Sequence, residues 1–221
     1  MTPAFTPLLG VRILSLALNL PGPAALMRCR RMGAACVKVE PPSGDPMGHY
    51  NREAYAQLHE GVEVVQADLK SAAGQDVVHR ALGQADVLLT SFRPSALRKL
   101  GLGWDALQAR YPALSQVAIV GAAGARAEEP GHDLTYLADN GLVPGLELPS
   151  TLYADMGGSV MASEAVLQAA LHRRQGRDGA PPAGLYLEVA LSDAAAYLAL
   201  PRRWGLTQAT GSVGGAHAGY R

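Results

Sequence analysis

The chain has 221 residues, and 48% of them are hydrophobic, which suits one sizeable core rather than two or more full domains. Its 19 basic and 19 acidic residues cancel, so the balance of charge argues against nucleic acid or an anionic membrane as a partner. Any anion-binding site must therefore be local.

The N-terminal apolar stretch is broken by Arg12 and Asn19 and has no basic region ahead of it, so we expect neither a leader peptide nor a membrane span. Cys29 and Cys36 lack metal-ligand spacing, and we predict buried thiols in a reducing compartment and no metal site. The sequence thus predicts a cytoplasmic protein.

Short apolar runs alternate with helix-like stretches. The opening predicts a strand over 11–18, a turn at Pro21-Gly22-Pro23, a helix over 24–32 and a second strand over 35–39. Further strands are expected over 85–90, 114–120 and 185–191, and further helices over 71–82, 95–100, 104–111 and 159–174, with a last helix capped by Ser192-Asp193. This alternation predicts an α/β fold with a Rossmann-like parallel sheet flanked by helices over residues 1–204. Residues 205–221, rich in Gly, are expected to form a poorly packed tail.

One apparent motif is set aside. The run Gly101-Leu102-Gly103-Trp104-Asp105-Ala106 matches the glycine pattern of dinucleotide-binding loops, but a helix-like segment precedes it. The pattern needs a preceding strand, so we do not expect a dinucleotide site there.

Seven short segments carry a family resemblance through their order and spacing. They are Pro21-Gly22-Pro23, Val37-Lys38-Val39-Glu40-Pro41-Pro42, Asp68-Leu69-Lys70, Ser91-Phe92-Arg93-Pro94, Lys99-Leu100-Gly101-Leu102-Gly103, Gly131-His132-Asp133-Leu134-Thr135-Tyr136-Leu137 and Ala154-Asp155-Met156-Gly157-Gly158. With them the chain resembles the class III coenzyme A transferases of the CaiB/BaiF type, a family that includes formyl-CoA transferase, carnitine CoA-transferases and α-methylacyl-CoA racemase. The resemblance implies an acyl-CoA substrate, with coenzyme A arriving as part of that substrate and no permanently bound cofactor.

His132 favours the racemase branch, because the transferases of the family generally lack this histidine. Racemisation next to a thioester carbonyl needs one group to remove a proton and another to return it on the opposite face, and His132 and Asp155 are the natural pair. Asp133 is expected to orient His132. The alternative interpretations are a loop histidine bonded to backbone and, for Asp155, a helix N-cap.

The same aspartate also suits a CoA-transferase, in which Asp155 attacks the thioester and carries the acyl group as a mixed anhydride. Under either reaction we expect the backbone N–H groups of Gly157 and Gly158, near a helix N-terminus, to stabilise charge on the thioester oxygen. The resemblance further implies coenzyme A contacts at Ser91, Phe92 and Lys99, where Lys99 stands in place of the usual arginine.

Several features depart from the family. Pro41 replaces a common basic residue, residues 60–64 lack the usual Lys and Arg, and Leu18 and Leu20 stand where transferases carry polar contacts. Relatives also continue through a second, smaller domain. We therefore expect a homodimer or a partner chain that supplies that domain, and a truncated non-catalytic paralogue or partner subunit remains an alternative to an enzyme.

Overall fold

The structure, a computed structural model, describes residues 5–176 and 180–207 and is built around one parallel sheet. The strands are β1 (Arg12–Ser15), β2 (Ala35–Glu40), β3 (Glu63–Gln66), β4 (Val87–Thr90), β5 (Ser115–Val120) and β6 (Tyr186–Ala190). Their order across the six-stranded sheet is β3-β2-β1-β4-β5-β6, and every neighbouring pair is parallel. This is the doubly wound order, in which strands are added first on one side of β1 and then, from β4 onward, on the other, and it confirms the predicted Rossmann-like fold.

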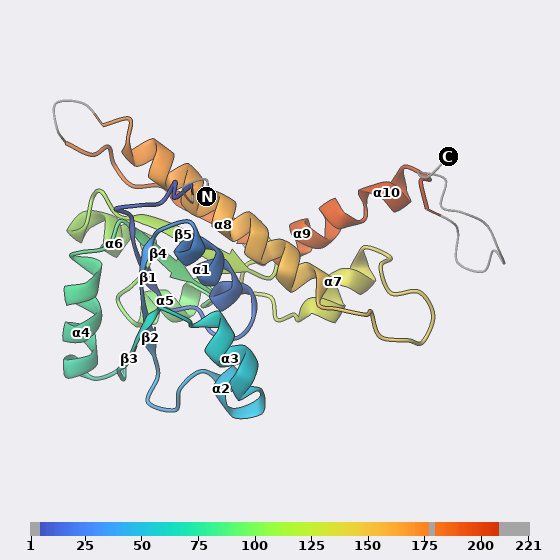
Figure 1. Cartoon of the computed structure of the whole chain (residues 1–221), viewed down its shortest axis with the longest axis horizontal. Helices are drawn as coiled ribbons and strands as arrows, with labels where there is room; N and C mark the ends of the chain where they lie inside the picture. The colour runs from blue at the N-terminus through green and yellow to red at the C-terminus, as the bar shows by residue number, and fades with distance from the viewer. Residues whose placement is uncertain (1–4, 177–179, 208–221) are drawn as a thin grey trace.

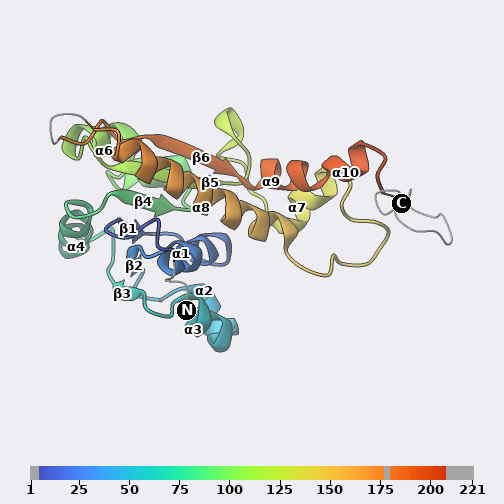
Figure 2. The same ribbon diagram turned by 45° about the horizontal axis from the view of Figure 1, so that its top comes forward.

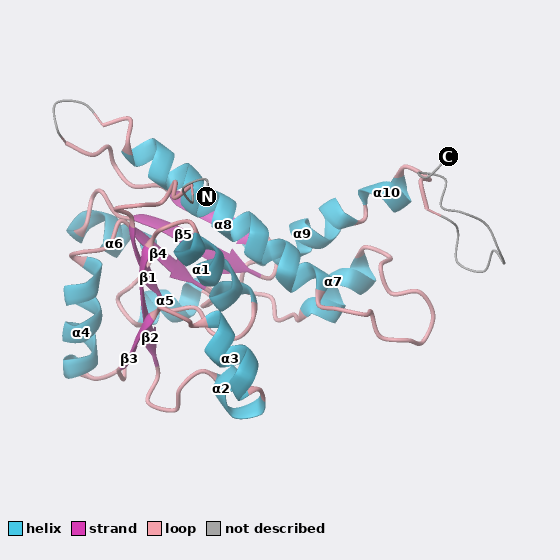
Figure 3. Cartoon of the chain, viewed as in Figure 1, coloured by secondary structure: helices cyan, strands magenta, loops and turns pink. Residues whose placement is uncertain are grey.

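Helices cover both faces of the sheet (Figure 3). They are α1 (Pro21–Arg31), α2 (Pro46–Tyr50), α3 (Arg52–Leu58), α4 (Ala72–Leu82), α5 (Pro94–Lys99), α6 (Trp104–Arg110), α7 (Asp133–Asp139), α8 (Tyr153–Arg173), α9 (Leu191–Leu198) and α10 (Leu200–Arg203). In Figure 1, α7, α9 and α10 extend beyond the sheet beside the first part of α8, and Figure 2 shows the same arrangement from another angle.

Alternating strand residues divide the core into two layers. Ile13 and Leu89 belong to the cluster under α1 and α8, whereas Leu14, Leu16 and Leu88 belong to the cluster under α4, α5 and α6. Successive strand residues point to opposite faces, so a strand with continuous apolar sequence feeds both layers. The apolar runs in the sequence therefore marked strands buried on both sides.

Most predicted elements are present, and the differences have local causes. Residues 41–66 contain α2, α3 and the edge strand β3, which the sequence did not reveal because these elements are short and β3 is largely exposed. The final helix begins at Leu191 with Ala190 at the N-cap, so the expectation that Ser192-Asp193 caps it was wrong. Both residues lie inside its first turn.

A helix, α5, does precede Gly101, as expected for a segment that is not a dinucleotide-binding loop. Within residues 5–176 and 180–207, no helix combines the length and the apolar character needed to cross a membrane. The expected tail over 205–221 lies outside the described residues from 208 onward.

Candidate active site

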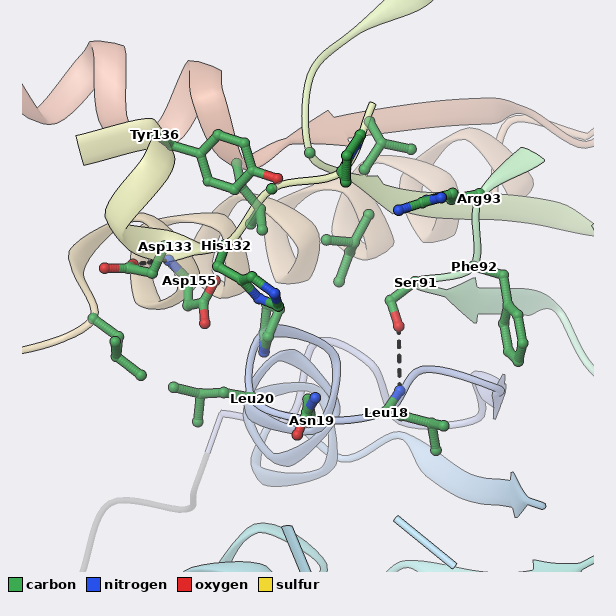
Figure 4. Close-up of a pocket in the computed structure, with 18 of the residues that line it drawn as sticks. Leu18, Asn19, Leu20, Ser91, Phe92, Arg93, His132, Asp133, Tyr136 and Asp155 are labelled. Atoms are coloured by element: carbon green, nitrogen blue, oxygen red, sulfur yellow. Dashed lines mark hydrogen bonds between the residues drawn. The ribbon is translucent and has the colours of Figure 1, made fainter. Parts of the chain in front are cut away.

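A pocket of about 500 Å³ opens at the carboxyl ends of the central strands (Figure 4). Its walls come from residues 18–21, 91–93, 119–121 and 129–133, together with Tyr50, Ala127, Tyr136, Leu152, Asp155 and Leu191. The loops after β1 and β4 meet here, and ligands of open α/β sheets bind at such a reversal point. Five residues predicted from the sequence therefore share one cavity: Ser91, Phe92, His132, Asp133 and Asp155.

The loop after β4 and the loop after β1 are joined by a hydrogen bond. The Leu18 N–H donates to Ser91 Oγ over 3.2 Å, and Phe92 forms the adjoining wall of the pocket. Lys99 does not line the pocket, because it sits exposed in the last turn of α5. Of the three coenzyme A contacts that the resemblance implied, the structure thus places two in the cavity.

The start of α1 differs from a dinucleotide-binding helix start. Pro21 and Pro23 have no backbone N–H, so this helix offers fewer donors to a phosphate than a glycine-rich start would. Gly22 allows the close approach of α1 and the loop after β1, since a Cβ there would lie 2.2 Å from the Cβ of Ala17. The sequence Pro-Gly-Pro thus serves close packing beneath the pocket.

Asp155 lies in the first turn of α8, and Leu152 rather than Asp155 is the N-cap. The side chain is half-buried, and burial, followed by the charge of Asp133, raises its pKa from 3.8 to about 6, while His132 acts in the opposite direction. A carboxyl group with this pKa exchanges protons readily near neutral pH.

Asp133 has a different role from the one expected. Its carboxylate Oδ1 accepts a hydrogen bond from the Asp155 N–H over 2.9 Å, and only 6% of the residue is exposed. In the described part of the chain no hydrogen bond joins Asp133 to His132. Asp133 therefore holds the start of α8 and, with it, Asp155, instead of orienting the histidine.

His132 is the N-cap residue of α7, and its side chain is exposed in the pocket wall. Its backbone N–H donates to Thr135 Oγ1 over 3.3 Å, which fixes the backbone at the start of the helix. The ring of His132 also approaches the Thr135 N–H in a capping box, and it lines the pocket, where it can meet a ligand.

Gly157 and Gly158 do not present their N–H groups to the pocket. They are the fifth and sixth residues of α8, where N–H groups already bond within the helix. A Cβ on Gly157 would lie 3.3 Å from Leu198, and one on Gly158 would lie 2.3 Å from Leu191. Their function in this fold is the close packing of α8 on α9, which corrects the predicted role in oxyanion binding.

Tyr136 is a pocket residue that was not singled out as a site residue from the sequence. Its hydroxyl group sits against two glycines, since a Cβ on Gly121 or Gly131 would lie 2.2 or 2.4 Å from it. Burial, followed by the charge of Asp155, raises the pKa of Tyr136. The contact of the Tyr136 hydroxyl with Gly121 and Gly131 depends on tertiary packing, so the sequence offered no signal for it.

Three further pocket residues, Asn19, Tyr50 and Arg93, were also missed. Asn19 has a φ of 63°, a left-handed conformation that asparagine tolerates better than most residues. The sequence signal that could have identified Asn19 as a pocket residue is that it is the one polar residue in an apolar stretch, over 16–21. Tyr50 comes from α2, an element that the sequence did not predict.

Glu40, Asp45 and His59 form a buried group with the donor set of a metal site. The ammonium group of Lys38, also buried, contacts all three: it lies 3.0 Å from Glu40 Oε1 and 2.8 Å from His59 Nε2, and it bonds to Asp45 Oδ2. The ammonium group thus already occupies the place that a cation would take.

The two cysteines are free and buried, as predicted. Burial raises the pKa of each thiol to about 12, so neither supplies a thiolate near neutral pH. Neither lines the pocket.

Comparison with known proteins gives consistent matches over most of the chain. A family model described as CoA-transferase family III matches residues 8–218. A probable fatty acyl-CoA transferase of Mycobacterium tuberculosis is 32% identical over 192 residues, which cover 76% of this chain and 48% of that protein. The α-methylacyl-CoA racemase of Mus musculus is 30% identical over 200 residues, with 86% and 49% covered. The chain thus spans about half the length of these relatives.

Solved structures agree with these matches. A CAIB/BAIF family protein from Brucella suis superposes with a TM-score of 0.79 at 26% identity, covering 90% of this chain and 57% of that one. A hypothetical protein from Mycobacterium tuberculosis superposes with a TM-score of 0.76 at 30% identity, covering 90% and 59%.

Proposed function

Because this chain belongs to CoA-transferase family III, we propose that it acts on an acyl-CoA thioester as an α-methylacyl-CoA racemase-like enzyme. In this reaction the proton on the carbon next to the thioester carbonyl is removed from one face and returned on the other. His132 and Asp155 are the proposed acid/base pair.

The observation that carries the proposal is that both side chains line one pocket while the pKa of Asp155 is raised to about 6. A carboxyl group with this pKa can hold or release a proton near neutral pH, and histidine is the side chain most often used as a general acid or base. His132 comes from the N-cap of α7 and Asp155 from the first turn of α8. Two different elements thus bring the two groups to the cavity.

The proton transfers balance without a cofactor. One group, as a base, takes the α-proton, and the electron pair of the C–H bond moves into the carbonyl to give an enolate. The other group, as an acid, donates its proton to the opposite face of the same carbon. The Asp133 carboxylate holds the backbone of Asp155 during these steps.

The test is exchange of the α-proton of one enantiomer of 2-methylbutanoyl-CoA in deuterated water, followed by mass spectrometry and chiral analysis. The wild type should incorporate deuterium and invert the centre, and His132→Ala should lose inversion, by about 10²-fold or more, while still binding the substrate. His49→Ala is the matched control, because His49 is exposed and does not line the pocket. Inversion at the wild-type rate in His132→Ala would refute the histidine's role.

A second candidate is a CoA-transferase with Asp155 as the nucleophile. Among the relatives, a succinyl-CoA–D-citramalate CoA-transferase of Chloroflexus aurantiacus is 33% identical over 185 residues, which supports this alternative. Incubation with acyl-CoA and hydroxylamine should then yield a hydroxamate at Asp155. Inversion without such an adduct supports the racemase. If the protein shows neither inversion nor an adduct, the result supports a non-catalytic partner subunit.

For coenzyme A we propose entry along Ser91 and Phe92, which line the pocket, with Lys99 as a phosphate contact farther out. The buried free thiols Cys29 and Cys36 support a reducing compartment such as the cytoplasm.

We further propose that the α8–α9 surface is an interface, with a second copy of the chain or with a chain that supplies a further domain. On α8, Tyr153, Met156 and Val160 are exposed by 41%, 40% and 46% and lie at helical spacing, and Tyr197 on α9 is exposed by 70%. A clustered apolar surface of this kind is typical of interfaces.

A further inference from the structure

We propose that the side-chain amide of Asn19 donates a hydrogen bond to the thioester carbonyl oxygen of a bound acyl-CoA. This inference rests on the proposed action on acyl-CoA. It holds for either reaction, because proton removal and attack by Asp155 both place negative charge on the same oxygen.

The usual source of such a donor is the start of a helix. At α8 two of these groups already have partners: the Asp155 N–H bonds to Asp133 Oδ1 and the Met156 N–H bonds to the Leu152 carbonyl. The N–H groups of Gly157 and Gly158 lie deeper in the helix and bond within it. The N–H of Asp155 itself is thus engaged, and a side-chain donor on the opposite wall of the pocket can serve the oxygen.

Asn19 supplies that donor from the loop after β1. The Tyr50 hydroxyl donates to Asn19 Oδ1 over 3.1 Å, which fixes the orientation of the amide. In Figure 4 the amide nitrogen of Asn19 points towards the cavity, and the amide oxygen points away from it. Among the residues that the structure describes, none accepts a hydrogen bond from Asn19 Nδ2, so both of its protons remain available.

The backbone of Asn19 is fixed in its left-handed conformation. Its N–H bonds to both carboxylate oxygens of Asp45, at 3.2 and 3.1 Å, and the neighbouring Leu18 N–H bonds to Ser91 Oγ. The loop is thus held from both sides, by the segment after β2 and by the loop after β4. A donor fixed in advance loses little free energy to reorganisation when charge develops.

Asp45 is in turn held by the buried cluster around Lys38. The Lys38 ammonium bonds to Asp45, the Asp45 N–H donates to Glu40 Oε2 over 3.1 Å, and the Tyr55 hydroxyl donates to Glu40 Oε1 over 2.9 Å. With Lys38 as its central cation, this cluster acts as the positioning device for Asn19. The cluster is connected to the pocket through a single carboxylate, that of Asp45, which accepts the Asn19 N–H.

The first test compares Asn19→Gly with Asn19→Asp. Glycine adopts a φ of 63° without strain, so Asn19→Gly removes the amide and leaves the loop conformation accessible. Asn19→Asp keeps the shape but replaces the donor with a charged acceptor. We expect α-proton exchange of isobutyryl-CoA to fall about 10²-fold in Asn19→Gly and further in Asn19→Asp, with the dissociation constant changed less than about threefold. Tyr50→Phe, which only frees the amide to rotate, should give a smaller loss.

A second measurement does not depend on turnover. Isobutyryl-CoA labelled with ¹³C at the carbonyl should show a downfield carbonyl resonance when bound to the wild type, and this shift should be lost in Asn19→Gly. An unchanged bound resonance, or exchange within threefold of the wild type, would overturn the role of Asn19. Failure of the wild type to bind isobutyryl-CoA would overturn the proposed function and this inference together.

Discussion

The negative charge of Asp155 is disfavoured by its surroundings, because the side chain is half-buried and the buried carboxylate of Asp133 lies near it. Its pKa of about 6 in the folded chain lies above the ordinary value of 3.8. The folded state therefore binds this proton more tightly than the unfolded state does, and ionisation of Asp155 lowers the free energy of unfolding as the pH rises from about 4 to about 6. The unfavourable ionisation of Asp155, which suits a proton-transfer group, can thus be measured as a change in the free energy of unfolding with pH.

Asp155→Asn should stabilise the protein at neutral pH, because it removes the buried charge while keeping the shape. Each pKa unit corresponds to about 1.4 kcal/mol, and partial access of water reduces the effect, so we expect a gain of about 1 to 2 kcal/mol at pH 7. Urea denaturation between pH 4 and pH 8 measures it. The gain should shrink steeply as the pH falls towards 4, because Asp155 is then protonated in the folded state and partly protonated in the unfolded state, whose pKa is 3.8.

Asp139→Asn is the matched control for that series, since Asp139 is exposed in the last turn of α7. It should change the free energy of unfolding by less than about 0.5 kcal/mol at any pH. A gain in Asp155→Asn that is independent of pH would show that ionisation is not the cause.

Helix α8 links the chemistry to the packing at the scale of secondary structure. It runs for 21 residues, and its first turn holds Asp155 while its buried face packs on α1 and α9. The two glycines after Asp155 bring α9 close, and Leu191, the first residue of α9, reaches the pocket wall. The position of α9 therefore shapes the cavity through a single close contact.

The two glycines should respond differently to alanine. In Gly157→Ala the new methyl group meets Leu198 and Ala194 at 3.3 and 3.4 Å, which small shifts accommodate, and alanine favours the helix by up to about 1 kcal/mol. In Gly158→Ala the methyl group would lie 2.3 Å from Leu191 Cδ2, so this side chain must move, at a cost of about 1 to 3 kcal/mol. Urea denaturation of the two variants gives the comparison, and equal stabilities would contradict the packing role.

At the scale of the whole molecule, the sheet and its helices form a doubly wound domain from which α7, α9 and α10 extend (Figure 1). Helices α7 and α9 pack on each other and on α8, and α10 packs on α9. Exposed apolar side chains on this part of the molecule include Tyr197 and Trp204. This surface and the pocket share α8, since Asp155 faces the cavity while Tyr153 and Met156 are exposed. An interface here would therefore lie close to the pocket.

We expect the protein to self-associate, with a two-fold dimer as the commonest form of assembly. Sedimentation equilibrium at micromolar concentration measures this, and Val160→Lys should weaken association by at least about tenfold by placing a charge in the apolar surface. Leu171→Lys, at the other end of α8 and exposed by 57%, is the control. A wild type that is monomeric under these conditions would contradict self-association and leave pairing with a separate chain as the remaining proposal.

The sequence by itself determined the parallel α/β fold, and its resemblance to a known family brought Ser91, Phe92, His132 and Asp155 forward as site residues, all of which line the pocket. Alternating apolar runs report which elements are buried on both sides, and parallel strands place the residues that follow them at one edge of the sheet. Both the apolar runs and the strand ends are local features of the chain, so they can be recognised without knowledge of tertiary contacts.

Only the tertiary structure decided how these residues are held. The bonds from Asp133 to the Asp155 N–H and from Asp45 to the Asn19 N–H span 22 and 26 residues, and no periodicity encodes such partners. The same is true of Gly157 and Gly158, whose neighbours on α9 lie more than thirty residues away in the chain. Hydrophobic pattern depends on each residue's own environment, whereas the pKa of Asp155 and the conformation of Asn19 depend on which distant side chains the packing brings beside them.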